Sequence, residues 1–336
     1  MPPSRTIAKA RAKGKKSAND VYSLGVTRSS PDGPRAALEA SWTPAQITRI
    51  DRALDDAVKC DALVAFDWDN TVMRGDIGDL VMLEVLAEHE IQKPAQWSEW
   101  GPLTEAAVDA LNTAFGTSST LALEADTARA LLAEIAWSDT AHGAPAFDPR
   151  TNEVFRAPYW MMACLLEALP EETRIALSQK AFGKAQQAPL EHRARNVEAF
   201  ARPRPAMLAL ARWAESRGVA TWVVSASEET IVRAIATSLG FDGARVIGAS
   251  PAASLQTFGE RVMTFDEGKR MHLAHRACGQ SAEAARGHRP RIAIACGDSD
   301  TDFGMLACAE LIVLFDRGQP RVTKLAEARD AIRLTP

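Results

Sequence analysis

The stretch that decides the fold is Ala-Phe-Asp-Trp-Asp-Asn-Thr-Val, residues 65–72. Its first two residues end an apolar run that begins at residue 63, and this run has the length and composition of a buried strand. Asp67 and Asp69 follow the run directly, and Thr71 adds a hydroxyl. Two carboxylates at the end of a buried strand repel each other and lose hydration, so such a pair usually holds a cation or moves a proton. The motif lacks the glycine and the final glutamate of an EF-hand, which argues against a calcium loop.

Composition limits the class of protein further. The 336 residues are 46% hydrophobic and 24% charged, as in globular proteins with one large domain or two smaller ones. A net charge of −4 argues against a nucleic-acid partner. No apolar stretch approaches the roughly 20 residues of a membrane-spanning helix, so we expect no membrane insertion. Five cysteines without a C-x-x-C pair argue against a zinc site or a disulfide framework and favour a reducing, cytoplasmic location.

The N-terminal end of the chain is basic. Its first twenty residues contain six lysines and arginines and one acid, with no apolar segment typical of a secretory signal. We expect a disordered tail over residues 1–40, with an organelle-targeting segment as the alternative. Ordered structure is expected from about Ser41, because Thr43 can cap a helix that has Pro44 at its first position. The oligomeric state is left open.

The rest of the chain divides by pattern into a helical part and an α/β part. Between residues 72 and 201 we find no convincing strand, and runs rich in alanine, leucine and glutamate predict helices at 104–111, 121–135, 161–169 and 171–182. Further along, helices are predicted at 206–216, 228–239, 269–277 and 302–309, and strands at 220–224, 245–247, 292–295 and 311–315. Such alternation predicts a parallel sheet covered on both faces, with ligands beyond the carboxyl ends of the strands.

Three further polar clusters lie at strand ends or helix starts of the α/β part. They are Ser225, Lys269, and the pair Asp298 and Asp302. Taken singly, each has a structural explanation: the serine could cap the next helix, the lysine could be solvated, and the two acids could cap the last helix. Parallel topology, however, places all of them with Asp67 and Asp69 at one edge of the sheet. Carboxylates, a hydroxyl and a lysine together suit a phosphoryl group and Mg²⁺.

In order and spacing these residues resemble the haloacid dehalogenase superfamily, in particular its Mg²⁺-dependent phosphatases. The resemblance covers about residues 62–316 and includes all four family motifs. It implies a Rossmann-like α/β core at 41–73 and 202–336, with residues 74–201 inserted as a large, mostly helical cap of the C1 type. Such a cap closes over the site and selects the substrate. The implied activity is hydrolysis of a phosphomonoester through an aspartyl-phosphate.

The resemblance also implies a role for each motif residue. Asp67 is the nucleophile, and Asp69 is the general acid that protonates the leaving alcohol. The carboxylate of Asp67, the backbone carbonyl of Asp69 and the carboxylate of Asp298 hold Mg²⁺. The residues that bind the phosphoryl group are Ser225, Lys269 and the backbone of Ala226. The supporting residues are Thr71 and Asp302, the latter either as a water-mediated ligand or as an anchor for Lys269.

The substrate is expected to be a small phosphorylated metabolite, because a large cap leaves no room for a macromolecule. The chain is similar to phosphoserine phosphatases and phosphorylcholine phosphatases, and Asp76 stands where the former carry a glutamate that recognises the substrate amino group. Aromatic rings can cage a quaternary ammonium, and the candidates are Trp97, Trp100, Trp137, Tyr159 and Trp160. Arg74, Arg156 and Arg204 are candidates for binding a substrate carboxylate. As alternatives, Asp76 caps a helix and the aromatic residues are core of the cap.

Two other functions stay open at this point. The same chemistry can transfer the phosphoryl group to a small alcohol, which would make the protein a phosphotransferase. The chain could also be a catalytically silent binding protein, although its intact set of acids and lysine argues against this.

Overall fold

The computed structural model describes residues 33–148, 157–187, 190–192, 197–250 and 265–336. Its centre is a six-stranded sheet in which every neighbouring pair of strands is parallel. The order across the sheet is β11 (Val246–Ala249), β10 (Thr221–Glu228), β1 (Leu63–Phe66), β12 (Ile292–Gly297), β13 (Ala309–Phe315) and β14 (Ile332–Leu334). This arrangement confirms the predicted α/β class and places β1 between the strands that end near Ser225 and Asp298.

Both faces of the sheet are covered by helices. Alternate residues of a strand point to opposite faces, and in β1 Val64 and Phe66 join one apolar cluster while Leu63 and Ala65 join another. The first cluster includes residues of α2 (Pro44–Cys60), α9 (Pro205–Ser216) and α10 (Glu229–Ser238). The second includes residues of α11 (Glu267–Arg276), α13 (Phe303–Leu306) and α14 (Pro320–Ala328). Two covered faces explain why the strands read as continuous apolar runs.

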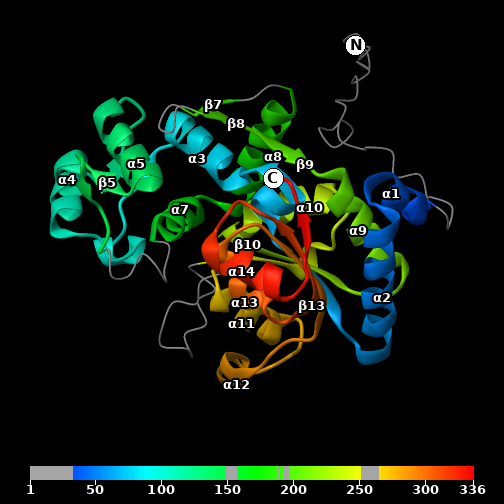
Figure 1. The fold of residues 1–336 in the computed structure, drawn as a ribbon. Coiled ribbons are helices and arrows are strands. Elements are labelled where there is room, and N and C mark those ends of the chain that lie inside the picture. The colour runs from blue at the N-terminus through cyan, green and yellow to red at the C-terminus, as the bar shows by residue number, and fades with distance from the viewer. Residues whose placement is uncertain (1–32, 149–156, 188–189, 193–196, 251–264) are drawn as a thin grey trace, which may run out of the picture.

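A second group of helices comes from the segment between β1 and β10. These helices are α3 (Ile77–Glu88), α4 (Glu105–Phe115), α5 (Asp126–Ser138), α7 (Ala157–Glu167) and α8 (Glu171–Gln187). In Figure 1, α4 and α5 lie on the left, well away from the sheet, whereas α8 packs against α3 and α10. The inserted segment therefore has a part that packs on the core and a part that projects from it.

The prediction that no strand lies between residues 72 and 201 is wrong. The described part of this segment holds four antiparallel pairs: β2 (Met73–Gly75) with β9 (Ala201–Pro203), β3 (Ile91–Gln92) with β4 (Thr120–Leu121), β5 (Thr140–Ala141) with β6 (Ala144–Pro145), and β7 (Leu190–His192) with β8 (Val197–Ala199). Strands of two or three residues are too short to show a period of two. The β2–β9 pair joins the point where the chain leaves the core to the point where it returns.

The helix predicted at 228–239 is present as α10, but the alternative that Ser225 caps it is wrong. β10 continues to Glu228, whose side chain accepts a hydrogen bond from the Ile231 N–H and caps α10. The end of one other predicted helix also needs correction. The helix predicted at 302–309 is a 3₁₀ turn, η6 (Asp300–Asp302), followed by α13, which ends at Leu306. It is short because β13 already begins at Ala309.

Ordered structure begins earlier than predicted. α1 (Gly33–Ser41) is a helix within the range expected to be a disordered tail, and Leu38 is fully buried. Arg35 donates a hydrogen bond to Asp51 of α2 at 2.6 Å, which fixes α1 to the core. Thr43 caps α2 with Pro44 in the first turn, as predicted. The basic stretch itself, within residues 1–32, lies outside the described residues.

The remaining described elements are short. They are η3 (Trp97–Trp100), η4 (Gly243–Arg245) and α12 (Ala282–Gly287). Among the helices of the described ranges, none combines the length and hydropathy that crossing a bilayer requires.

Candidate active site

The acids predicted from the first and fourth motifs meet at the carboxyl ends of β1 and β12. β1 ends at Phe66, and the Asp67 N–H donates to the Cys296 carbonyl of β12 at 2.9 Å. The turn η2 (Trp68–Val72) then reverses the chain, with Asn70 at a φ of +62°. This turn leaves the Asp67 carboxylate only 7% exposed. The strand ends therefore hold charge in a place that is nearly closed to water.

Lys269 is the cation at the centre of this cluster. Its ammonium group donates to Asp67 Oδ1 and to Asp302 Oδ1, both at 2.6 Å, and its side chain is 0% exposed. Burial alone would lower the pKa of Lys269, but the adjacent carboxylates of Asp302 and Asp67 outweigh it and raise that pKa. Burial also raises the pKa of Asp67, with the charge of Asp302 acting in the same direction. Lys269 is thus a fixed, permanently charged partner of Asp67.

Asp302 lies behind the cluster and uses both carboxylate oxygens. Its Oδ1 accepts from Lys269, and its Oδ2 accepts from the backbone N–H groups of Asp298 and Ser299 at 2.9 and 3.0 Å. Of the two roles left open by the sequence, this geometry matches an anchor for Lys269. Asp302 also holds the loop that presents Asp298. Thr71 is fully buried, and its hydroxyl has no hydrogen-bond partner among the described residues.

Asp69 is held by two serines rather than by one. Its Oδ2 accepts from Ser227 Oγ at 2.7 Å and from Ser225 Oγ at 3.3 Å, and its Oδ1 accepts from the Ile77 N–H at 2.8 Å. Ser227 is missing from the sequence prediction, although residues two apart on a strand share a face, and this spacing could have revealed it. Burial raises the pKa of Asp69 to about 6, despite the opposing hydrogen bonds from Ser227 and Ile77. Asp69 therefore exchanges a proton near neutral pH.

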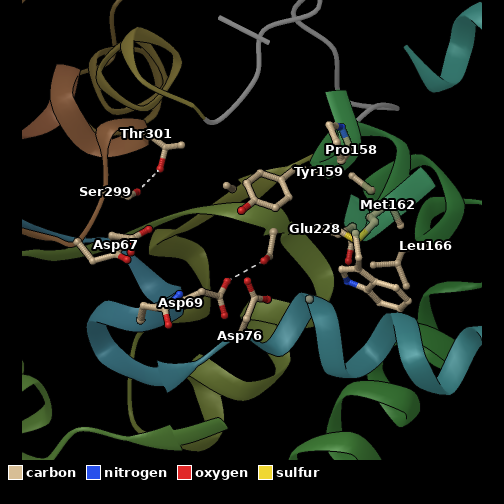
Figure 2. A pocket seen from close by; sticks show the side chains of 18 of the residues that line it. Asp67, Asp69, Asp76, Pro158, Tyr159, Met162, Leu166, Glu228, Ser299 and Thr301 are labelled. Atoms are coloured by element: carbon tan, nitrogen blue, oxygen red, sulfur yellow. Dashed lines mark hydrogen bonds between the residues drawn. The ribbon is translucent and has the colours of Figure 1, made fainter. Parts of the chain in front are cut away.

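A cavity of about 310 Å³ opens beside these acids. Its polar side comes from the α/β core and is lined by Asp67, Asp69, Asp298, Ser299 and Thr301. Its apolar side comes from α5 and α7 of the inserted segment and is lined by Trp137, Tyr159, Met162 and Leu166. Figure 2 shows the ring of Tyr159 between the acids and the apolar residues of α7. The size suits a small organic ligand.

Of the predicted phosphate-binding residues, Ala226 lines the cavity, while Ser225 and Lys269 lie buried behind its wall at 1% and 0% exposure. The predicted motif residues nevertheless come together at one edge of the sheet. The strand ends produce this convergence, as parallel topology requires.

Arg317 belongs to the site, and the sequence prediction missed it. It follows β13, lines the cavity, and donates from Nη1 to Asp298 Oδ2 at 2.8 Å. Burial and the charge of Asp302 raise the pKa of Asp298 to about 6, against the opposing effect of Arg317. The sequence signal that could have found it is its position just after the strand at 311–315, next to the strand that presents Asp298.

Of the five aromatic candidates, two line the cavity and three do not. Tyr159 and Trp137 are the two at the cavity. Trp97 and Trp100 pack edge to face at 5.2 Å from each other, and Trp97 also packs on Phe115 at 5.5 Å. Trp160 is buried and donates to the Glu99 carbonyl at 2.9 Å. Trp97 and Trp100 thus belong to the packing of the helical segment, as the alternative predicted, whereas Trp160 packs with Phe265 of the α/β part.

The charged candidates for substrate binding also divide. Asp76 lines the cavity and at the same time caps α3 by accepting from the Asp79 N–H at 3.0 Å. Arg74 stacks over the Phe200 ring at 5.4 Å, and Arg204 stacks over another ring, so neither lines the cavity. Arg156 lies outside the described residues. Trp137, which lines the cavity, donates to Asp79 Oδ1 at 2.7 Å.

The residues present fit a divalent cation. Asp67, Asp298 and Asp302 are all buried, and they offer carboxylate oxygens that lie within 4.8 Å of one another. Carboxylate oxygens are the ligands that Mg²⁺ prefers. Because Asp302 uses both oxygens within the protein, Asp67 and Asp298 are the two carboxylates suited to hold the cation.

Comparison with known proteins agrees with a hydrolase site built on this sheet. The family model of haloacid dehalogenase-like hydrolases matches residues 115–307, more than half of the chain, and the protein belongs to this family. The matched range contains Ser225, Lys269 and Asp298, whereas Asp67 and Asp69 precede it. No curated protein sequence matches the chain.

Two solved structures resemble the chain. A conserved protein of unknown function from Anaerococcus prevotii is 14% identical, with a TM-score of 0.51 over 87% of this chain and 92% of its own. A protein of unknown function from Bordetella pertussis is 16% identical, with a TM-score of 0.44 over 81% of this chain and 97% of its own. At such identities, the first comparison supports the fold alone.

Proposed function

We propose that this protein is a Mg²⁺-dependent phosphatase that hydrolyses a small phosphomonoester, with residues 74–201 acting as its cap. The observation that carries the proposal is the buried arrangement of Asp67, Lys269 and Asp302 beside Asp298 at the edge of a cavity. A nucleophile, a fixed cation and a cation-binding pair of carboxylates are what phosphoryl transfer requires. Membership of a hydrolase family supports the same reaction class.

In the proposed reaction, a carboxylate oxygen of Asp67 attacks phosphorus while the bond from phosphorus to the leaving alcohol breaks. Asp69 gives its proton to the departing oxygen, which leaves with the electron pair. Water then attacks the phosphorus of the aspartyl-phosphate and Asp69 takes the water proton, while the bond from phosphorus to the Asp67 oxygen breaks. Phosphate is released and Asp67 returns to a carboxylate. A pKa of about 6 suits Asp69 to both steps, because the group exists in both protonation states near neutral pH.

The other residues of the site compensate charge and position the two reacting carboxyl groups. Lys269 offsets negative charge beside Asp67, and Asp302 keeps Lys269 in place. The two serines orient the Asp69 carboxyl group. Mg²⁺, held by Asp67, Asp298 and the backbone carbonyl of Asp69, would supply positive charge to the phosphoryl oxygens.

The cavity favours a substrate with a cationic group, of the phosphoserine or phosphocholine type. Asp76 lines the cavity beyond Asp69, and the rings of Tyr159 and Trp137 line the side that comes from the inserted helices. A carboxylate with aromatic faces nearby is a setting that binds ammonium groups. The volume of about 310 Å³ supports a small phosphorylated metabolite as the substrate.

The test is phosphate release from a panel that contains phosphoserine, phosphocholine, phosphoethanolamine and sugar phosphates, with Mg²⁺ or with EDTA. We expect Mg²⁺-dependent release, fastest for the substrates with a cationic group, and its loss in Asp67→Asn. Asp56→Asn, at an exposed acid outside the cavity, is the matched control and should retain activity. Equal rates on sugar phosphates would refute the cationic preference, and normal turnover by Asp67→Asn would refute the mechanism.

A further inference from the structure

The second cation of the site is Arg317, and its side chain is far less enclosed than that of Lys269. Lys269 is fully enclosed between two carboxylates, whereas the side chain of Arg317 is 45% exposed and contacts Asp298 through Nη1. A guanidinium has five N–H donors, so a contact through one nitrogen leaves donors for a further oxyanion. Arg317 can therefore change partner without exposing a buried charge of its own.

The backbone that carries Arg317 is fixed. Asp316 Oδ1 accepts from the Gly318 N–H at 2.9 Å and from Thr323 Oγ1 at 2.8 Å, which closes the turn. Gln319 Oε1 accepts from the Asp300 N–H at 2.6 Å, which ties the same loop to the turn after Asp298. A fixed backbone with a half-exposed side chain places the guanidinium at the cavity while leaving its torsions free.

Charge balance shows when Arg317 would leave Asp298. Four carboxyl groups, Asp67, Asp69, Asp298 and Asp302, face two cations, Lys269 and Arg317. A divalent cation held by Asp67 and Asp298 would balance these charges, so that Asp298 would no longer depend on the guanidinium. A phosphoryl dianion in the cavity would then add negative charge, which the guanidinium can offset.

We propose that Arg317 is a substrate-binding residue that exchanges partners: its guanidinium, which contacts Asp298 through Nη1, binds a phosphoryl oxygen once Asp298 holds a divalent cation instead. The inference rests on the proposed function, because it assigns an oxyanion to the same cavity. Its consequence is an ordered cycle in which cation and phosphate binding support each other. Before phosphate binds, Arg317 competes with the cation for Asp298. After phosphate binds, Arg317 offsets the negative charge of the phosphoryl group.

Calorimetric titration of the full chain tests this with two probes, Mg²⁺ alone and then inorganic phosphate at saturating Mg²⁺. In Arg317→Met we expect tighter Mg²⁺ binding and about tenfold weaker phosphate binding, since a hydrogen bond to a charged group of this kind is removed. Arg317→Lys keeps the charge and should recover part of the phosphate affinity. Arg321→Met is the matched control, because Arg321 pairs with Asp266 and stacks over Phe303, and it should change neither affinity.

Unchanged phosphate binding by Arg317→Met overturns the proposal, as does Mg²⁺ binding that is unchanged or weaker than in the native chain. Failure of the native chain to bind Mg²⁺ or phosphate overturns it as well. The titration contains no phosphomonoester, so its outcome is separate from that of the turnover panel. Native binding with no turnover on any substrate would refute the proposed function and leave the role of Arg317 standing.

Discussion

The buried ammonium of Lys269 gives the sharpest prediction about stability. In Lys269→Met, the carboxylates of Asp67 and Asp302 lose the partner that each contacts at 2.6 Å, and Asp302 is 0% exposed. Removing one member of a buried ion pair typically costs about 3–5 kcal/mol, because the remaining charge stays buried without compensation. We therefore expect the free energy of unfolding at pH 7 to fall by about that amount.

The loss should depend on pH. Burial already raises the pKa of Asp67 above its unfolded value, and removal of Lys269 raises it further. A carboxyl group with a raised folded pKa stabilises the fold below its unfolded pKa, and this contribution is lost as pH rises through the folded pKa. The variant should therefore lose more stability than the native chain as pH rises above the ordinary range of a carboxyl pKa.

Urea unfolding followed by circular dichroism in EDTA measures both effects. Lys59→Met is the control, because Lys59 is 72% exposed in its pair with Asp56, and its unfolding should match that of the native chain. In the double variant Lys269→Met with Asp302→Asn, both a cation and an anion are removed, so it should be more stable than Lys269→Met alone. An Lys269→Met chain as stable as the native one at pH 8 would refute the reasoning.

Three further predictions follow from contacts around the site. Asp69→Asn should slow turnover of alkyl phosphates by about 100-fold or more, but turnover of p-nitrophenyl phosphate much less, because p-nitrophenolate leaves without a proton. Turnover of alkyl phosphates by the native chain should fall above a pH of about 6, as Asp69 loses its proton. Equal losses on both substrates would contradict the role of Asp69 as general acid. Arg174→Met should cost about 3 kcal/mol in urea unfolding, because Glu228, paired with it at 2.6 Å, is left buried, and an unchanged midpoint would count against this. Gly75→Ala should cost at least about 2 kcal/mol in the same assay, because φ is +96° and a Cβ would lie 1.7 Å from the Phe200 carbonyl oxygen; native stability would disprove that close approach.

The sequence predicts the sheet and the convergence of the acids well, because both follow from strong, regular signals. Apolar runs of four or five residues mark the central strands β1, β12 and β13. Parallel order then brings the residues after those strands to one edge. Asp67 and Asp298 are found in this way without knowledge of any side-chain contact, and Lys269 is found from its position at a predicted helix start.

The features that the sequence misses depend on contacts between distant segments. Arg317 has no motif around it, and only the neighbouring positions of β12 and β13 bring it to Asp298, 19 residues earlier. Trp97 and Trp160 look like ligand-binding rings in the sequence, but Trp97 packs partly buried against the helical segment, and Trp160 is buried with Phe265. The short pairs such as β2–β9 likewise form because tertiary structure brings their ends together.

The central claim is that Asp67 carries the phosphoryl group during turnover. Acid quenching of the protein after a brief exposure to ³²P-labelled substrate and Mg²⁺, followed by peptide mapping by mass spectrometry, tests this directly. The account predicts an acid-stable, alkali-labile label on Asp67, which is absent in Asp67→Asn. Turnover without a labelled protein, or a label that persists in Asp67→Asn, would contradict it.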